Sequence, residues 1–264
     1  MHTLTVNLPA TAMRSYPIHI GHGLLHDCDL LAALTPQQQI CIVTNDNVAR
    51  HYLVPLTAAL AGKTVITVHL PDGEAHKTLA SYAQILNALV AARYDRDSLI
   101  IALGGGIIGD IAGFAAATYQ RGIAALQIPT TLLAQVDSSV GGKTGVNHPQ
   151  GKNLIGAFHQ PQAVIIDTAT LATLPPREFA AGMAEVIKYG LINDPAFFTW
   201  LEANRDGIRA HDPALLAEMI AHCCASKAAI VAADEREQGV RALHNYGHTF
   251  GHALEALTRY NRWK

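Results

Sequence analysis

The stretch Leu99-Ile100-Ile101-Ala102-Leu103-Gly104-Gly105-Gly106-Ile107-Ile108-Gly109-Asp110 decides the fold. A short apolar run leads into three consecutive glycines and a second apolar segment, which is typical of a buried strand, a tight turn and a helix. Gly104, Gly106 and Gly109 satisfy G-x-G-x-x-G, a pattern that brings backbone and a helix N-terminus close to a pyrophosphate. About 20 positions later, where an acidic residue is expected, the sequence has Pro129-Thr130-Thr131, so a glycine-rich turn without a ligand stays open.

Strand-like runs alternate with segments of helical period on both sides of this stretch, as far as about residue 170. The clearest helix between two strands is Lys77–Arg93, where apolar residues recur at helical spacing. This alternation predicts an α/β fold with a parallel sheet, to which we assign residues 1–175. The predicted strands are Ile40–Thr44, Thr64–Leu70, Ser98–Leu103, Ala125–Ile128 and Ala163–Ile166.

The strand pattern stops after Leu174-Pro175-Pro176, and only helical patterns follow. The predicted helices are Arg177–Leu191, Pro195–Asn204, Pro213–Ala233 and about Ala242–Tyr260. We therefore assign residues 176–264 to an all-helical region. This region is small for an independent domain of four packed helices.

Composition excludes several classes of protein. The 19 Lys and Arg against 21 Asp and Glu give a net charge of -2, which disfavours a binder of nucleic acid or of an anionic membrane. The four cysteines include the adjacent pair Cys223-Cys224 and no C-x-x-C, so neither a disulfide framework nor a zinc knuckle is indicated. Residues 1–15 lack a charged region followed by an apolar run. We expect a cytoplasmic protein with no nucleic-acid or membrane partner.

Two further loops carry charge. Pro71–Lys77 places acids and a lysine at the carboxyl end of a predicted strand, although a plain turn stays open. Gly141-Gly142-Lys143-Thr144 lacks the earlier glycine of an ATP-binding P-loop, because that position holds Asp137. What remains is a flexible, glycine-lined segment with Lys143 and Lys152, and Arg121 upstream, that suits a small anionic substrate. A solvated loop is the alternative.

Three histidines, His244, His248 and His252, recur every fourth residue and so share one face of a predicted helix. Two imidazoles at this spacing can chelate a divalent metal, and a carboxylate from elsewhere can complete such a site. Glu185 lies in an apolar segment with Lys188 one turn away, so it is expected to be paired or metal-ligating. A set of structural histidines remains the alternative.

Five blocks resemble the 3-dehydroquinate synthase family: PDGEAHK, ALGGGIIGDIAGFAAATYQRG, IPTTLLAQVDSSVGGKTGVNHPQGKNLIGAF, LATLPPREFAAGMAEVIKYG and HNYGHTFGHALEA. The resemblance implies an NAD-binding α/β domain followed by a helical metal-binding domain. It implies cyclisation of a small phosphorylated sugar acid, 3-deoxy-D-arabino-heptulosonate 7-phosphate, to 3-dehydroquinate with release of phosphate, in the shikimate pathway to aromatic amino acids. The cofactors would be NAD and Zn²⁺, with Co²⁺ as a possible substitute, and the assembly a homodimer.

The resemblance also implies roles for individual residues. NAD contacts are expected at Asp72, Glu74, Lys77, Gly106 to Asp110 (including Gly109), Thr130, Thr131, Lys143, Lys152 and Thr170 to Thr173. Zinc ligands are expected at Glu185 and His248. Substrate contacts are expected at Arg121, Lys143, Lys152, Asn153, Lys188, Lys227, Arg241, Asn245 and His252, with Arg121 reaching across a dimer. Catalytic roles are expected for Asp137, Lys143, Lys188, Asn245 and His252.

One block of the family pattern is missing. A third zinc ligand is expected in a W-x-H-G-E block, whereas this sequence ends at Trp263-Lys264. We therefore expect a weak two-ligand zinc site and a chain that can lack activity. Two alternatives stay open: an NAD- and metal-dependent polyol dehydrogenase, and a non-catalytic NAD-binding remnant. The cluster of lysines and arginines favours the synthase over the dehydrogenase.

Overall fold

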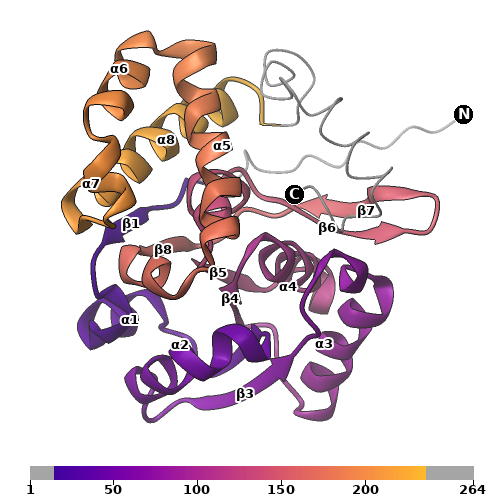
Figure 1. The fold of residues 1–264 in the computed structure, drawn as a ribbon. Coiled ribbons are helices and arrows are strands. Elements are labelled where there is room, and N and C mark those ends of the chain that lie inside the picture. Colours follow the sequence, from indigo (N-terminus) through magenta and orange to yellow (C-terminus); the bar gives the residue numbers. More distant parts are fainter. Residues whose placement is uncertain (1–14, 236–264) are drawn as a thin grey trace, which may run out of the picture.

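A six-stranded parallel sheet forms the centre of the molecule (Figure 1). The structure is a computed structural model and describes residues 15–235. Its strand order is β1-β8-β5-β4-β2-β3. The strands are β1 (Ile18–Gly21), β2 (Gln39–Thr44), β3 (Thr64–His69), β4 (Leu99–Gly104), β5 (Ala124–Pro129) and β8 (Ala163–Asp167). All five strands predicted from the sequence are present within one residue at each end, which confirms the fold class; the short edge strand β1 was not predicted.

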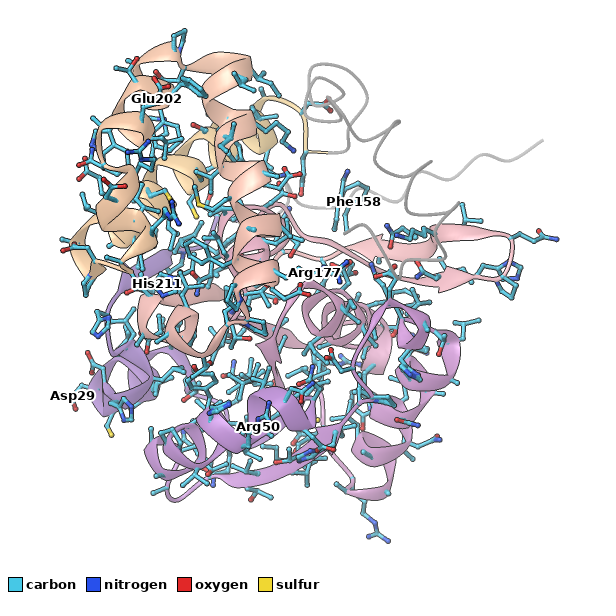
Figure 2. All side chains as sticks on the ribbon, in the orientation of Figure 1. Asp29, Arg50, Phe158, Arg177, Glu202 and His211 are labelled. Atoms are coloured by element: carbon cyan, nitrogen blue, oxygen red, sulfur yellow. The ribbon has the colours of Figure 1, made fainter. Side chains whose placement is uncertain are left out.

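The sheet is covered on both faces, which explains its continuous apolar strands. In β2, Ile40 and Ile42 face one core and Cys41 and Val43 face another. Helices from the first part of the chain fill both sides, and Figure 2 shows side chains occupying the space between these layers. The first core includes residues of α1 (Cys28–Leu34) and α2 (Asp46–Ala59), and the second includes residues of α3 (Leu79–Ala91) and α4 (Gly106–Thr118).

The helical region packs on the sheet near β8 (Figure 1). Val164 and Ile166 of β8 share a core with Val186, Met219 and Ile220 of the helices. These helices are α5 (Pro176–Asn193), α6 (Pro195–Ala203), α7 (Arg205–Arg209) and α8 (Pro213–Ala233). Three of the four predicted helices are present, α7 was not predicted, and the fourth, Ala242–Tyr260, lies outside the described residues. The division of the chain at residue 175 stays a prediction.

Helix α8 is long and apolar enough to cross a membrane by length and composition alone. Its buried Leu216, Met219, Ile220 and Cys223 belong to the core beside β8. Packing inside the protein therefore accounts for the apolar residues on this face of the helix.

Residues 143–158 correct one expectation. Instead of a flexible loop they form an antiparallel hairpin of β6 (Lys143–His148) and β7 (Gly151–Phe158). Its glycines permit close packing: a Cβ on Gly156 would lie 2.1 Å from the carbonyl oxygen of Thr144. Ile155 packs toward the core of α4, while Phe158 at the end of the hairpin is half exposed (Figure 2). The glycines indicated tight backbone approach rather than flexibility.

Short turns complete the fold at the strand ends. Four are of the 3-10 type, and one is a π-helical turn. They are η1 (Leu24–His26), η2 (Glu74–His76), η3 (Tyr119–Arg121), the π-helical η4 (Ala134–Ser138) and η5 (Thr168–Thr173). Because π-helical turns are rare and occur mostly at functional sites, η4 directs attention to the residues around it.

Candidate active site

The predicted site residues gather at the carboxyl edge of the sheet. β4 lies between β2 and β5, and the chain proceeds outward from β2 to β3 on one side and from β4 to β5 on the other. Such a reversal opens a crevice beyond the strand ends, where open α/β sheets bind their ligands. The loops that follow β2, β3, β4, β5 and β8 all end at this edge.

The glycine turn after β4 has the geometry of a phosphate cradle. Helix α4 begins at Gly106, and its N-cap Gly105 offers no side chain to the first turn. A Cβ on Gly106 would lie 2.8 Å from Oγ of Ser138, and one on Gly105 would lie 3.0 Å from Cγ2 of Thr131. Glycine therefore lets the helix start lie directly against Ser138 and Thr131, and backbone N–H groups at a helix start attract a pyrophosphate. These residues fit the diphosphate of NAD.

A polar network joins the loop after β3 to the hairpin. Lys77 is buried and its Nζ donates to Asp110 of α4 and to Oδ1 of Asn153, the latter at 2.6 Å. Asn147 of β6 donates from Nδ2 to Oε1 of Glu74 at 2.8 Å and accepts from the backbone N–H of Asn153 at 2.9 Å. The loop, α4 and the hairpin are therefore fixed relative to one another.

Asp110 has an unusual titration. Burial raises its pKa to about 6, although the Lys77 ammonium acts in the opposite direction. The carboxylates of Glu74 and Asp137 raise it further. The residue after Asp137, Ser138, lies against Gly106, so the turn that carries Asp137 is next to the glycine turn.

Four more predicted cofactor contacts lie along the same edge. Asp72 accepts from Asn45 at 3.1 Å and from Asn47 at 2.9 Å, both from the residues after β2. Thr173 lies 2.5 Å from the hydroxyl of Tyr52. The backbone N–H of Thr130 donates to Gly104, whereas Thr131 caps the next turn by accepting from Ala134.

Thr170 belongs to a buried set of bonds beneath η4. Its Oγ1 accepts from Nε2 of Gln135 at 3.0 Å and donates to the carbonyl of Asp167 at 2.8 Å. These bonds hold the start of η4 against the end of β8. The hydrogen bonds from η5 therefore help to hold the turn that carries Asp137 in place.

A second group of charges is carried by η4, α5 and α8, and we call it the helix-borne cluster. Its members are Asp137, Glu185, Lys188, Tyr189 and Lys227. Lys227 Nζ donates to Oδ1 of Asp137 at 2.5 Å, and Lys188 forms an ion pair with Glu185 one turn earlier on α5. Both lysines are buried, with 8% and 7% of their surface exposed. Two buried ammonium groups, each opposite a carboxylate, are suited to bind an anionic substrate.

Of the remaining predicted residues, some lie in the described part of the chain and the others lie outside it. Lys143 begins β6 and Lys152 lies on β7, 3.9 Å from Glu74. Arg121 lies beyond the C-terminal end of α4, about a helix length (~20 Å) from the glycine turn. Its role across a dimer therefore stays a prediction. Arg241, Asn245, His248 and His252 lie outside the described residues.

Several residues of the site were not predicted from the sequence. Tyr189 donates to the carbonyl of Val136 at 3.0 Å and to Asp137 at 3.3 Å. Asn147 bridges the loop and the hairpin, and Asn45 and Asn47 hold Asp72. The run of polar residues directly after the buried strand β2 was a usable signal for the asparagines, whereas nothing in the sequence distinguishes Tyr189.

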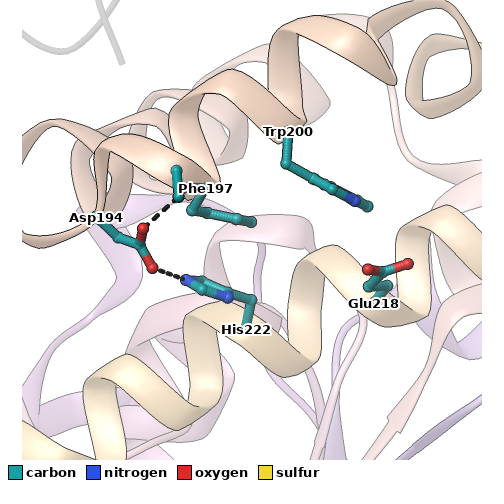
Figure 3. A pocket seen from close by; sticks show the side chains of 6 residues that line it. Asp194, Phe197, Trp200, Glu218 and His222 are labelled. Atoms are coloured by element: carbon teal, nitrogen blue, oxygen red, sulfur yellow. Dashed lines mark hydrogen bonds and ion pairs between the residues drawn. The ribbon is translucent and has the colours of Figure 1, made fainter.

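A separate pocket of about 220 Å³ lies between α6 and α8 (Figure 3). His222 lies 3.2 Å from Asp194 and stacks on Phe197, with ring centroids 3.8 Å apart. Trp200 and Glu218 complete its wall. None of the predicted site residues lines this pocket, so it is distinct from the crevice at the strand ends.

Of the two predicted metal ligands, Glu185 lies within the described residues and His248 lies outside them. Glu185 has 17% of its side chain exposed and points its charge at Lys188. Within residues 15–235, no group of three His, Cys, Asp or Glu side chains is arranged to hold a metal ion. The carboxylate of Glu185 is partly buried and already faces a cation, the Lys188 ammonium. Glu185 therefore fits one ligand position of a metal site.

The parallel sheet, the glycine cradle and the adjacent buried lysines define a nucleotide-dependent α/β enzyme for an anionic substrate. Two family models together match residues 67–264 of the chain. They are 3-dehydroquinate synthase N-terminal over residues 67–181 and 3-dehydroquinate synthase C-terminal over residues 182–264. A 3-dehydroquinate synthase of Pseudomonas fluorescens (strain SBW25) is 59% identical over 263 residues, covering 100% of this chain and 71% of that relative. The chain belongs to the 3-dehydroquinate synthase family, as the five sequence blocks predicted.

Solved structures of similar fold include two sugar cyclases. A 2-deoxy-scyllo-inosose synthase complexed with carbaglucose-6-phosphate, NAD⁺ and Co²⁺ has a TM-score of 0.82 at 31% identity, over 91% of this chain and 67% of that one. The 2-epi-5-epi-valiolone synthase ValA from Streptomyces hygroscopicus subsp. jinggangensis 5008, with NAD⁺ and Zn²⁺ bound, has a TM-score of 0.84 at 28% identity, over 95% and 70%. The architecture is therefore shared with NAD-binding, metal-binding cyclases.

Proposed function

We propose that this chain is the catalyst of the family reaction, the NAD-dependent cyclisation of 3-deoxy-D-arabino-heptulosonate 7-phosphate to 3-dehydroquinate with release of phosphate. The observation that carries the proposal is the pair of buried lysines, Lys188 and Lys227, beside the glycine cradle. The substrate is a seven-carbon sugar acid with a phosphate at one end and a carboxylate at the other. Ammonium groups bind both anions through charge-assisted hydrogen bonds, which a neutral polyol would not require.

NAD would be held at the glycine turn and by the loop after β3. Gly105 and Gly106 fit its diphosphate, and Asp72, Glu74 and Lys77 lie along the neighbouring loop. When bound, NAD supplies a reversible hydride acceptor, so that it is restored in each turnover. Lys77 connects this loop to Asp110 and Asn153 and would thereby fix the position of the cofactor side relative to the substrate side.

A divalent metal would be held by Glu185 together with His248. A bound Zn²⁺ or Co²⁺ polarises a substrate hydroxyl and makes it more acidic. Lys188, which now neutralises Glu185, would then be released to meet an anionic group of the substrate. Lys143, Arg241, Asn245 and His252 are proposed as further substrate contacts on the resemblance alone.

The helix-borne cluster would orient the substrate. Lys227 Nζ donates to Asp137 Oδ1 at 2.5 Å in a partly buried place, so the carboxylate fixes the direction of the ammonium group. Lys152 and Asn153 approach from the hairpin on the other side. Remote charges of the substrate would thus fix the reacting carbons between hairpin and helices.

We also propose a homodimeric assembly in the cytoplasm, following the family resemblance. The net charge of -2 gives no support for a nucleic-acid partner. Size-exclusion chromatography with light scattering tests the assembly, and a monomer would contradict it.

The proposed activity is tested on the purified chain with NAD and Zn²⁺. We expect release of inorganic phosphate matched by formation of 3-dehydroquinate, without net accumulation of NADH. Steady NADH accumulation would instead identify a dehydrogenase. Binding of NAD with neither product would identify a non-catalytic remnant, and the zinc content measured alongside tests the expectation of a weak metal site.

A further inference from the structure

The π-helical turn η4 is held from two helices at successive carbonyl groups. Cys224 of α8 donates from Sγ to the carbonyl of Gln135 at 3.2 Å, and Tyr189 of α5 donates from Oη to the carbonyl of Val136 at 3.0 Å. The next residue along the turn is Asp137. Because the two bonds come from different helices, they fix both the position and the rotation of the segment that presents this carboxylate.

Tyr189 also acts on the carboxylate itself. Its Oη lies 3.3 Å from Oδ1 of Asp137, the same oxygen that accepts from Lys227 at 2.5 Å. The side chain is 1% exposed, and burial together with nearby Asp137 raises its pKa far above the ordinary value. The phenol therefore stays protonated and is a permanent donor, shared between the Val136 carbonyl and the carboxylate.

We propose that Tyr189 is a positioning residue that aims the carboxylate of Asp137 at Lys227. Tyr189 lies behind Asp137 and makes its two bonds to η4, so it acts through Asp137 and not on the substrate. The inference rests on the proposed function for its kinetic consequences. Its geometric content, that the hydroxyl maintains the Asp137–Lys227 pair, does not depend on any activity.

The other buried tyrosines of the described chain provide the contrast. Tyr94 donates to the carbonyls of Ile40 and Thr64, and Tyr119 donates to the carbonyl of Tyr94. Both hydroxyls therefore bond only to backbone. Tyr189→Phe and Tyr119→Phe remove the same atom from two buried side chains, 1% and 8% exposed, but only the first removes a bond to an ionised side chain.

The test compares Tyr189→Phe, Tyr119→Phe and Asp137→Asn in two measurements. The first is acetylation of Lys227 by acetic anhydride, quantified by peptide mass spectrometry with the partly exposed Lys63 as internal reference. Because a paired ammonium group must leave its carboxylate before it reacts, we expect about fivefold faster labelling of Lys227 in Tyr189→Phe and in Asp137→Asn. Tyr119→Phe should match the wild type. An unchanged labelling rate in Tyr189→Phe overturns the proposal.

The second measurement is phosphate release. We expect kcat to fall on the order of tenfold in Tyr189→Phe with little change in KM, and no further fall when Tyr189→Phe is added to Asp137→Asn. Equal losses in both backgrounds overturn the proposal, because Tyr189 would then act independently of Asp137. If the wild type releases no phosphate, the proposed function fails, while the labelling experiment still decides the positioning role.

Discussion

The two sides of the candidate site are built differently. On the cofactor side, Lys77 serves both Asp110 and Asn153, and Asn147 serves both Glu74 and the hairpin backbone, so each group has more than one partner. In the helix-borne cluster, buried Lys227 forms an ion pair with Asp137, and buried Lys188 forms one with Glu185. A shared network tolerates the loss of one bond, whereas removal of one ion of a buried pair leaves a charge with too little compensation. Single substitutions should therefore have larger effects in the helix-borne cluster.

The largest effect is expected from Lys227→Met, which keeps the length of the side chain but removes the ammonium partner of Asp137. We expect kcat/KM to fall by at least about a hundredfold and the free energy of unfolding to fall by about 2 kcal/mol, the latter reduced because water reaches part of the carboxylate. Phosphate release and urea denaturation measure the two quantities.

A double variant separates the two causes. Adding Asp137→Asn to Lys227→Met removes the uncompensated charge, so stability should largely recover while activity stays low. If the double variant is as unstable as Lys227→Met, lost packing of the lysine stem and not the unbalanced carboxylate explains the effect.

On the cofactor side, the glycine turn is the place where a single change should matter most. In Gly106→Ala the new Cβ would lie 2.8 Å from Oγ of Ser138 and would enter the ligand cradle. We expect NAD affinity, measured by isothermal titration calorimetry, to fall by roughly tenfold or more. Adding Ser138→Ala to Gly106→Ala removes the clash with Oγ of Ser138 and nothing else, so NAD affinity should stay low. Full recovery of NAD affinity in this double variant would show that Gly106 is needed for packing and not for the ligand.

The sequence predicted the strands and the glycine turn because both are local patterns. A strand buried on both faces is a continuous apolar run, and a turn that must approach a ligand needs glycine. The pairs Asp137–Lys227 and Lys77–Asn153 could not be read in this way, since their members are 90 and 76 residues apart and meet only when helices and hairpin pack. The family resemblance named these residues without giving their partners.

The hairpin shows a different limit of local patterns. The glycines of this segment, Gly145 and Gly151 among them, were interpreted as signs of flexibility, although glycine is equally required where two backbones approach closely. Composition cannot distinguish these cases. A strand pairing does, and it depends on residues on the opposite strand.

Titration of Asp110 sharpens the comparison on the cofactor side. Burial raises its pKa from 3.8 to about 6 in the folded protein, so the folded state binds the proton more tightly than the unfolded chain. Between those values the contribution of Asp110 to stability falls as the pH rises, and the penalty is complete above about pH 6. We expect the free energy of unfolding of the wild type, relative to Asp110→Asn, to fall by up to about 2 kcal/mol between pH 4 and pH 6.5.

Urea denaturation of both proteins across this pH range measures the difference, which cancels the titration of all other groups. The two proteins are compared by how this difference changes with pH. Asp110→Asn also removes a partner of buried Lys77, so its free energy of unfolding should be lower at every pH. A difference that stays constant with pH would show that the Lys77 ammonium fully compensates for burial.

The smallest effect is expected from Asn147→Ala, because the network around it is shared. The substitution removes the donor to Glu74 and the acceptor for the Asn153 N–H, while Lys77 still joins the loop to the hairpin through Asn153. We expect three- to tenfold weaker binding of both NAD and substrate, or about 1 kcal/mol each, and little change in kcat. His148→Ala, on the neighbouring exposed position of the same strand, is the matched control and should leave both affinities unchanged. Weaker binding of NAD alone would mean that the hairpin does not transmit the loop's position to the substrate side, and the two sides of the site would then be independent.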